Sequence, residues 1–222
     1  MSEAEWLAAK HPYDLIYHPK CRSDRKRRLF ATACARRVLP FLSDPRFAEV
    51  VAGCEEFADS VIAWKGVLAL RKVVRGAAKD LHAANGLEHQ NHAAAAFSAI
   101  TSKEFMSFKM AVEAATAAFA SQARPDWDGG RDRETAAQIG LARDIFGNPF
   151  RPVTVSAAWR TDTASAVASQ MYESRDFSAM PILADALQDA GCDNTAILDH
   201  CRDVNHPHVR GCWVVDMVLG KQ

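Results

Sequence analysis

The segment EHQNHAAAAFSAITSKEFMSFKMAVEAATAAFASQ, residues 88–122, decides the fold class. Its apolar side chains recur at spacings of three and four residues, which places them on one face of an α-helix. We therefore predict one long helix over residues 88–122, suited to the centre of a helical bundle. The apolar face consists of Phe97, Ile100, Phe105, Phe108, Val112, Ala115 and Phe119.

The rest of the chain follows the same helical pattern. Apolar side chains at three-to-four spacing alternate with Pro, Gly and polar capping residues, and no segment has the turn signals of a β-hairpin. Thr161 can begin one helix, Gly147 can end another, and the last helix is predicted from His208 to Leu219. We predict an all-α fold, a multi-helix bundle or irregular helical array of about nine or ten helices.

The stretch RPDWDGG, residues 124–130, is the best candidate for a linker because it combines Pro, two Gly and charged side chains. It separates a predicted N-terminal helical part, residues 1–123, from a C-terminal part, residues 131–222. The two parts either form separate domains or pack as one.

The net charge is +0, but residues 1–110 carry 17 Lys and Arg against 12 Asp and Glu. A polyanion should therefore prefer the first half.

The sequence also indicates the compartment. Its start, MSEAEW, lacks the basic and apolar regions of a secretory signal, and no stretch approaches the ~18 uncharged apolar residues of a membrane span. We predict a cytoplasmic protein without a membrane partner. Six cysteines in such a chain are typical of reduced thiols, either packed in the core or bound to a metal.

Several segments with a distinctive amino-acid sequence resemble those of a known family. They include SDRKRRLFATACARR, residues 23–37, RDIFGNPFRPV, residues 143–153, and HVRGCW, residues 208–213. In these segments the chain resembles an uncharacterised family of helical domains found in many copies in planctomycete-type bacterial genomes. The resemblance covers both ends of the chain and implies a bacterial cytoplasmic protein. It implies no activity, cofactor or catalytic residue.

Common catalytic and nucleotide-binding motifs are absent from the sequence. It contains no phosphate loop, no G-x-G-x-x-G, no G-x-S-x-G and no H-E-x-x-H. We therefore predict a non-enzymatic helical interaction or adaptor module whose partner is another protein, and we predict no cofactor.

Two groups of basic residues support an alternative function, contact with the phosphates of nucleic acid. Cations in the first turn of a helix oppose its dipole and destabilise it, so their presence there suggests a function other than stability. Phosphate contacts would provide affinity without sequence specificity. The structural explanation, which we favour, is that these side chains pair with Asp and Glu of the acidic half. The basic residues are Arg25, Lys26, Arg28, Arg36, Arg37, Arg71, Lys72, Arg75 and Lys79.

A second alternative is a zinc site near the C-terminus, where six Cys and His residues fall within residues 192–212. Zinc prefers four such ligands in a tetrahedron. His200 and Cys201 are adjacent and point about 100° apart on a helix, so both should not bind one ion. The best four ligands bracket one interhelical loop: Cys201, His206, His208 and Cys212. We favour packed thiols without bound zinc, with His200 on the exposed face of its helix.

Overall fold

The structure, a computed structural model, describes residues 1–102 and 106–221, and these residues form α-helices and connecting turns without a β-strand. The predicted all-α fold is confirmed. The described residues form twelve α-helices, two of them only five residues long, so the predicted nine or ten is close. The helices are α1 (Glu3–Leu7), α2 (Pro12–Ile16), α3 (Asp24–Arg37), α4 (Arg46–Ala58), α5 (Trp64–Ala83), α6 (Glu88–Ile100), α7 (Met106–Gln122), α8 (Trp127–Phe146), α9 (Asp162–Ser174), α10 (Met180–Asp189), α11 (Thr195–Arg202) and α12 (Trp213–Leu219).

Contacts between residues divide the chain into two compact units. Glu3–Ile139 makes up most of the first unit, and Gly140–Gln222 makes up most of the second. The division falls within α8, whereas the predicted linker occupies residues 124–130, of which residues 127–130 already belong to α8. The separation into domains at residues 123 and 131 stays a prediction.

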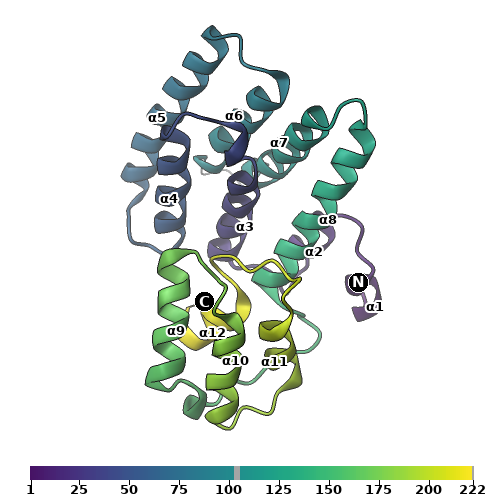
Figure 1. The fold of residues 1–222 in the computed structure, drawn as a ribbon, viewed down its shortest axis with the longest axis vertical. Coiled ribbons are helices and arrows are strands. Elements are labelled where there is room, and N and C mark those ends of the chain that lie inside the picture. Colours follow the sequence, from purple (N-terminus) through teal and green to yellow (C-terminus); the bar gives the residue numbers. More distant parts are fainter. Residues whose placement is uncertain (103–105, 222) are drawn as a thin grey trace. The chain divides into compact units, whose positions relative to one another are not determined.

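In the first unit, α3 packs against α4, α6 and α7, as the purple and teal helices of Figure 1 show. Ser23 begins α3 by accepting a hydrogen bond from the Lys26 backbone N–H at 3.3 Å. The core between these helices contains aromatic side chains in edge-to-face contact. Phe47 and Phe97, both buried, have ring centroids 5.0 Å apart.

The prediction of one helix over residues 88–122 is wrong, because α6 ends at Ile100 and α7 begins at Met106. The Thr101 hydroxyl donates to the Ser98 carbonyl at 2.8 Å, and the Ser102 N–H donates to the Ala99 carbonyl. Such local bonds offer the backbone an alternative to a longer helix. The apolar spacing continues across the break because α6 and α7 pack along each other. Phe105, assigned to the apolar face, lies outside the described residues.

In the second unit, α9 packs against α10 and α12, and α10 packs against α11. Thr161 and Asn194 accept hydrogen bonds from the first turns of α9 and α11 and thereby define where these helices begin. The apolar core between the four helices is built from Met171, Met180, Leu183, Leu187, Ile197, Val214, Val215 and Val218, among others.

The last helix begins at Trp213 instead of the predicted His208. Gly211 has a φ of +96°, which a right-handed helix does not allow, so the chain before Trp213 is a loop. Gly220, with a φ of +67°, ends α12 as predicted. Among the described residues, no helix combines the length and the apolar character that a bilayer crossing requires.

Candidate metal centre

Four side chains of the second unit bring potential metal ligands together from separate parts of the sequence. Asp144 lies in the last turn of α8, and His200 lies in the last turn of α11. His208 belongs to the loop after α11, and Cys212 immediately precedes α12. Their ligand atoms all lie within 4.8 Å of one another. This group is called the metal cluster below.

Asp144 connects the cluster to the backbone of the loop. Its side chain is fully buried, and its Oδ2 accepts a hydrogen bond of 2.9 Å from the Val209 backbone N–H. Its Oδ1 lies 2.9 Å from Nδ1 of His208 and 3.2 Å from Nε2 of His200. One carboxylate oxygen is therefore held by the loop while the other faces the imidazoles.

Cys212 completes the cluster on the side of α12. Its sulfur lies 3.2 Å from Nε2 of His200 and 3.9 Å from Nδ1 of His208. Zinc bonds of 2.0–2.3 Å in a tetrahedron imply distances of about 3.3–3.6 Å between neighbouring ligand atoms. Four of the six distances, at 2.9–3.9 Å, lie around this value, and no two ligand atoms are more than 4.8 Å apart. Small shifts would thus give the four atoms zinc-binding geometry.

A third histidine, His206, lies against the cluster. Its ring centroid is 4.9 Å from that of His200 and 5.4 Å from that of His208. Its Nε2 lies 3.9 Å from Oδ1 of Asp144. Nε2 of His206 and Nε2 of His208 are both buried, and neither has a hydrogen-bond partner among the described residues. A buried polar atom without a partner is costly, so these two nitrogens are places where a bound group would add a missing contact.

Burial and charge shift the pKa values of these groups. Burial opposes ionisation of Asp144, but hydrogen bonds from His200 and His208 outweigh it and lower the pKa of the carboxyl group. Burial, followed by the nearby Asp144 charge, raises the pKa of the Cys212 thiol well above its usual value. Burial also lowers the pKa of His206. A divalent cation would reverse the shift at Cys212, since a coordinating thiol loses its proton.

Two glycines allow the loop and α12 to approach α8. A β carbon on Gly140 would lie 3.3 Å from Cγ of Pro207, the residue between His206 and His208. Gly147, with a φ of +63°, ends α8, and a β carbon there would lie 3.1 Å from the Trp213 ring. Larger side chains at these positions would push the loop and Trp213 away from the cluster.

The structure brings together only part of the zinc set predicted from the sequence. His208 and Cys212 belong to the metal cluster, and His206 lies beside it. Cys201 is buried in the apolar core of the unit, and burial, followed by the charge of Asp144, raises the pKa of its thiol to about 12. His200, expected to be exposed, has a side chain only 11% exposed. It faces the cluster while the adjacent Cys201 faces the core, as their angular separation on α11 allows.

A cavity of about 320 Å³ lies beside the metal cluster. His206 and His208 form part of its wall, and the apolar part comes from Phe177, Met180, Pro181 and Val204. Asp203 also lines the cavity and is exposed. The volume is at the lower end of the range found for small-molecule pockets.

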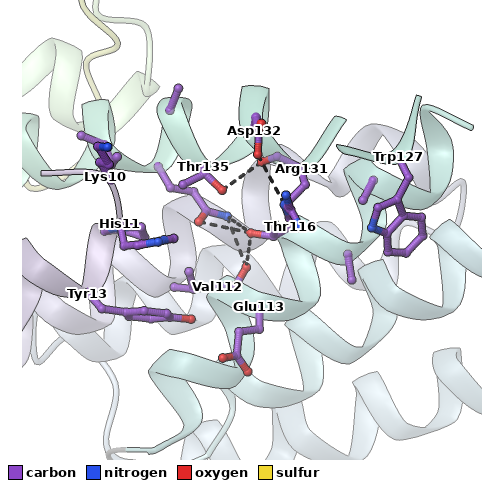
Figure 2. A pocket seen from close by; sticks show the side chains of 16 residues that line it. Lys10, His11, Tyr13, Val112, Glu113, Thr116, Trp127, Arg131, Asp132 and Thr135 are labelled. Atoms are coloured by element: carbon purple, nitrogen blue, oxygen red, sulfur yellow. Dashed lines mark hydrogen bonds and ion pairs between the residues drawn. The ribbon is translucent and has the colours of Figure 1, made fainter. Parts of the chain in front are cut away.

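A larger cavity, of about 780 Å³, lies in the first unit (Figure 2). Its wall is formed by the segment that follows α1 and by the helices α7 and α8. Several polar groups in its wall already bond within the protein. Gln138 donates to the Val112 carbonyl at 3.2 Å, and the Thr135 hydroxyl donates to the Arg131 carbonyl at 2.9 Å. The Tyr13 hydroxyl donates to the Lys109 carbonyl. This cavity therefore offers mainly apolar contact and a charged rim.

The basic residues near α3 are largely engaged in ion pairs. Arg25 pairs with Asp59 at 2.8 Å, and Arg36 pairs with Glu55 at 2.7 Å. Arg37 binds the buried Glu134 through two nitrogens. Arg28 lies over the rings of Phe57 and Phe108. These contacts give most of the basic residues of α3 a structural role. The expected pairing with the acidic half holds for Arg37, but Asp59 and Glu55 belong to the positive half of the chain.

The basic residues of α5 are arranged differently. Lys72, Arg75 and Lys79 are exposed, and Arg71 is half-buried. None of these four has an ion pair with a residue that the structure describes. The spacing of three and four residues places Lys72, Arg75 and Lys79 on one face, called the α5 stripe below.

Comparison with known proteins gives no family for this chain: no family model, no curated protein and no solved structure matches it. The resemblance to planctomycete helical domains stays a prediction.

Proposed function

We propose that this protein binds zinc in its C-terminal unit through Asp144, His200, His208 and Cys212. The single observation that carries the proposal is the convergence of four potential ligand atoms within 4.8 Å. They come from residues up to 68 positions apart in the sequence. Packing of an apolar core alone does not require a carboxylate, two imidazoles and a thiol to converge on one point.

The ligand types favour zinc over other common ions. Thiolate, imidazole and carboxylate are the three ligand classes of protein zinc sites, whereas magnesium and calcium prefer oxygen alone. The carboxylate of Asp144 and the thiolate of Cys212 would together neutralise a divalent ion. A neutral buried site costs less than one with an unpaired charge.

The proposed ion has a structural role. Its ligands come from α8, α11, the loop of residues 203–212, and the residue preceding α12, so it would connect segments that pack around one apolar core. The Val209 N–H bonded to Asp144 acts as an outer partner that orients the ligand. The C-terminal unit is thus a metal-organised helical module, consistent with a predicted role in interaction.

Elemental analysis tests the proposal directly. Protein purified without chelator and without a nickel affinity step should contain about one zinc ion per chain. Cys212→Ser and Asp144→Asn should each lose the zinc. Cys201→Ala is the matched control, because Cys201 is an equally buried thiol outside the metal cluster, and this variant should keep the zinc.

Two results would contradict the proposal. The first is wild-type protein that retains no zinc after incubation with excess zinc and dialysis. The second is loss of zinc in Cys201→Ala with retention in Asp144→Asn, which would point to the ligand set predicted from the sequence alone. Circular dichroism of each variant shows whether the helices remain.

A second candidate function is contact with nucleic acid through the α5 stripe. The observation that favours it is the exposure of Lys72, Arg75 and Lys79 without ion pairs to described residues. Such a stripe can bind phosphates through charge alone, which makes affinity strongly dependent on salt.

A further inference from the structure

We propose that the cavity beside the metal cluster binds a small neutral nitrogen heterocycle, which takes the place of His206 at the metal. This inference rests on the zinc site proposed above. It identifies the class of ligand that the site accepts and assigns a separate role to His206.

The first step concerns the number of ligands. The four atoms of the metal cluster fill a tetrahedral zinc ion, yet His206 places a further nitrogen 3.9 Å from Oδ1 of Asp144. Zinc can expand from four to five ligands when a further donor approaches. His206 is not one of the four converging ligands; it lies at the edge of the cluster, where a small movement would make it a fifth donor. Its side chain is 20% exposed, more than that of His200 or His208.

The second step concerns unsatisfied nitrogen atoms. Nε2 of His206 is buried without a hydrogen-bond partner among the described residues. The His208 side chain is only 7% exposed and also contains such an atom, at Nε2. Both rings form part of the cavity wall. A metal ion on Nδ1 of His208 would fix the proton on Nε2. That N–H would then line the cavity as a donor, and the π face of a bound aromatic ring can accept it.

The third step concerns the route to the metal. His206 lies in the loop after α11, and it both contacts the metal cluster and lines the cavity. A small movement of this ring would open a position on the ion toward the cavity. The apolar wall formed by Phe177, Met180 and Pro181 would then pack against the body of the ligand.

Charge determines the class of ligand. Zinc with the carboxylate of Asp144 and the thiolate of Cys212 is neutral, so an added anion would give the buried site an unpaired negative charge. Asp203, at the exposed part of the cavity, disfavours an anion further. A neutral heterocycle replaces the neutral imidazole of His206 without changing the charge. Its aromatic body also suits the apolar wall.

The test uses the full chain loaded with cobalt(II), which reports ligand changes through its visible absorption. The probes are 4-phenylimidazole and benzoate, which have similar apolar bodies but differ in charge. The heterocycle should change the cobalt spectrum in a saturable manner, and benzoate at the same concentration should not. If His206 occupies its position in about nine molecules of ten, His206→Ala should bind the heterocycle about tenfold more tightly.

A second variant checks that the cavity is the binding site. Val204, which is 84% exposed and lines the cavity, can be replaced by tryptophan without disturbing the core. Val204→Trp should keep the cobalt and lose the response to 4-phenylimidazole. Equal responses to benzoate and the heterocycle would overturn the charge argument.

The outcomes separate the two proposals. Cobalt that binds but does not respond to the heterocycle, either in the wild type or in His206→Ala, overturns this inference and leaves the metal site intact. A chain that binds neither cobalt nor zinc overturns both.

Discussion

At the scale of one residue, Gly140 shows that the metal cluster depends on close packing between α8 and the loop that carries His206 and His208. It lies in α8, four residues before Asp144, on the same side of the helix. Glycine within a helix costs about 1 kcal/mol relative to alanine, so its presence here needs a reason. The reason is Pro207, whose ring lies where a larger side chain would extend.

We therefore predict that Gly140→Val lowers zinc affinity about tenfold, the size of effect seen when groups that support a metal ligand are changed. The branched side chain must displace Pro207 together with the neighbouring histidines. Competition with a zinc-binding dye measures the affinity. Ala136→Val, at an exposed position of the same helix, is the control and should bind zinc like the wild type. Unchanged affinity in Gly140→Val would show that the loop does not need this contact.

At the scale of the element, α5 differs from α3 in how its basic residues are used. Arg25, Arg36 and Arg37 of α3 each pair with a carboxylate of the same unit. The residues of the α5 stripe have no such partners among the described residues and extend along a 20-residue helix. Surface charges of this kind add little to stability, so their removal should leave the fold intact.

If the stripe binds nucleic acid, replacing Lys72, Arg75 and Lys79 by Glu should abolish binding to any duplex while the circular dichroism spectrum stays unchanged. The wild type should bind without regard to sequence and lose affinity steeply with salt. An electrophoretic shift assay over a range of salt concentrations measures both effects. A control variant with Lys10, Lys109 and Arg133 changed to Glu gives the same total change in net charge outside the stripe. Absence of binding by the wild type even at low salt would remove this function.

The elements also show what the sequence could predict. Capping residues such as Thr161 and Asn194 and the terminal Gly220 are local signals, and the structure places helix ends beside them. The break between α6 and α7 has only the weak local signal of Thr101 and Ser102, and it is obscured because two helices that share a core continue one apolar spacing. Asp144 was missed for a related reason. It is a single acidic residue 56 positions before His200, and only the tertiary fold brings the two together.

At the scale of the whole molecule, the chain consists of two compact units, and the metal cluster belongs to the second, which has an apolar core of its own. A ligand that binds only the folded state stabilises the part that holds it. Zinc should therefore affect the second unit more than the first.

We predict that a strong chelator accelerates amide hydrogen exchange in residues 162–219 and leaves residues 24–58 unchanged. At a zinc concentration 100 times the dissociation constant, binding should stabilise the second unit by about 2.7 kcal/mol. Mass spectrometry of exchanged peptides compares the two regions in one sample. The Cys212→Ser variant should exchange like chelated protein whether or not zinc is present. Equal acceleration in both regions would show that the metal supports the whole chain.

The order of the ligands along the chain has a consequence for synthesis. Asp144 is made first and Cys212 last, 68 residues later. At about 5–20 residues per second, the ribosome adds Cys212 roughly 3–14 s after Asp144. During that interval a nascent chain lacks the thiolate of the proposed zinc site, so the four ligands can meet an ion only after Cys212 has been added. A chain that stops before Cys212 contains α1 to α11 but lacks one ligand of the proposed zinc site.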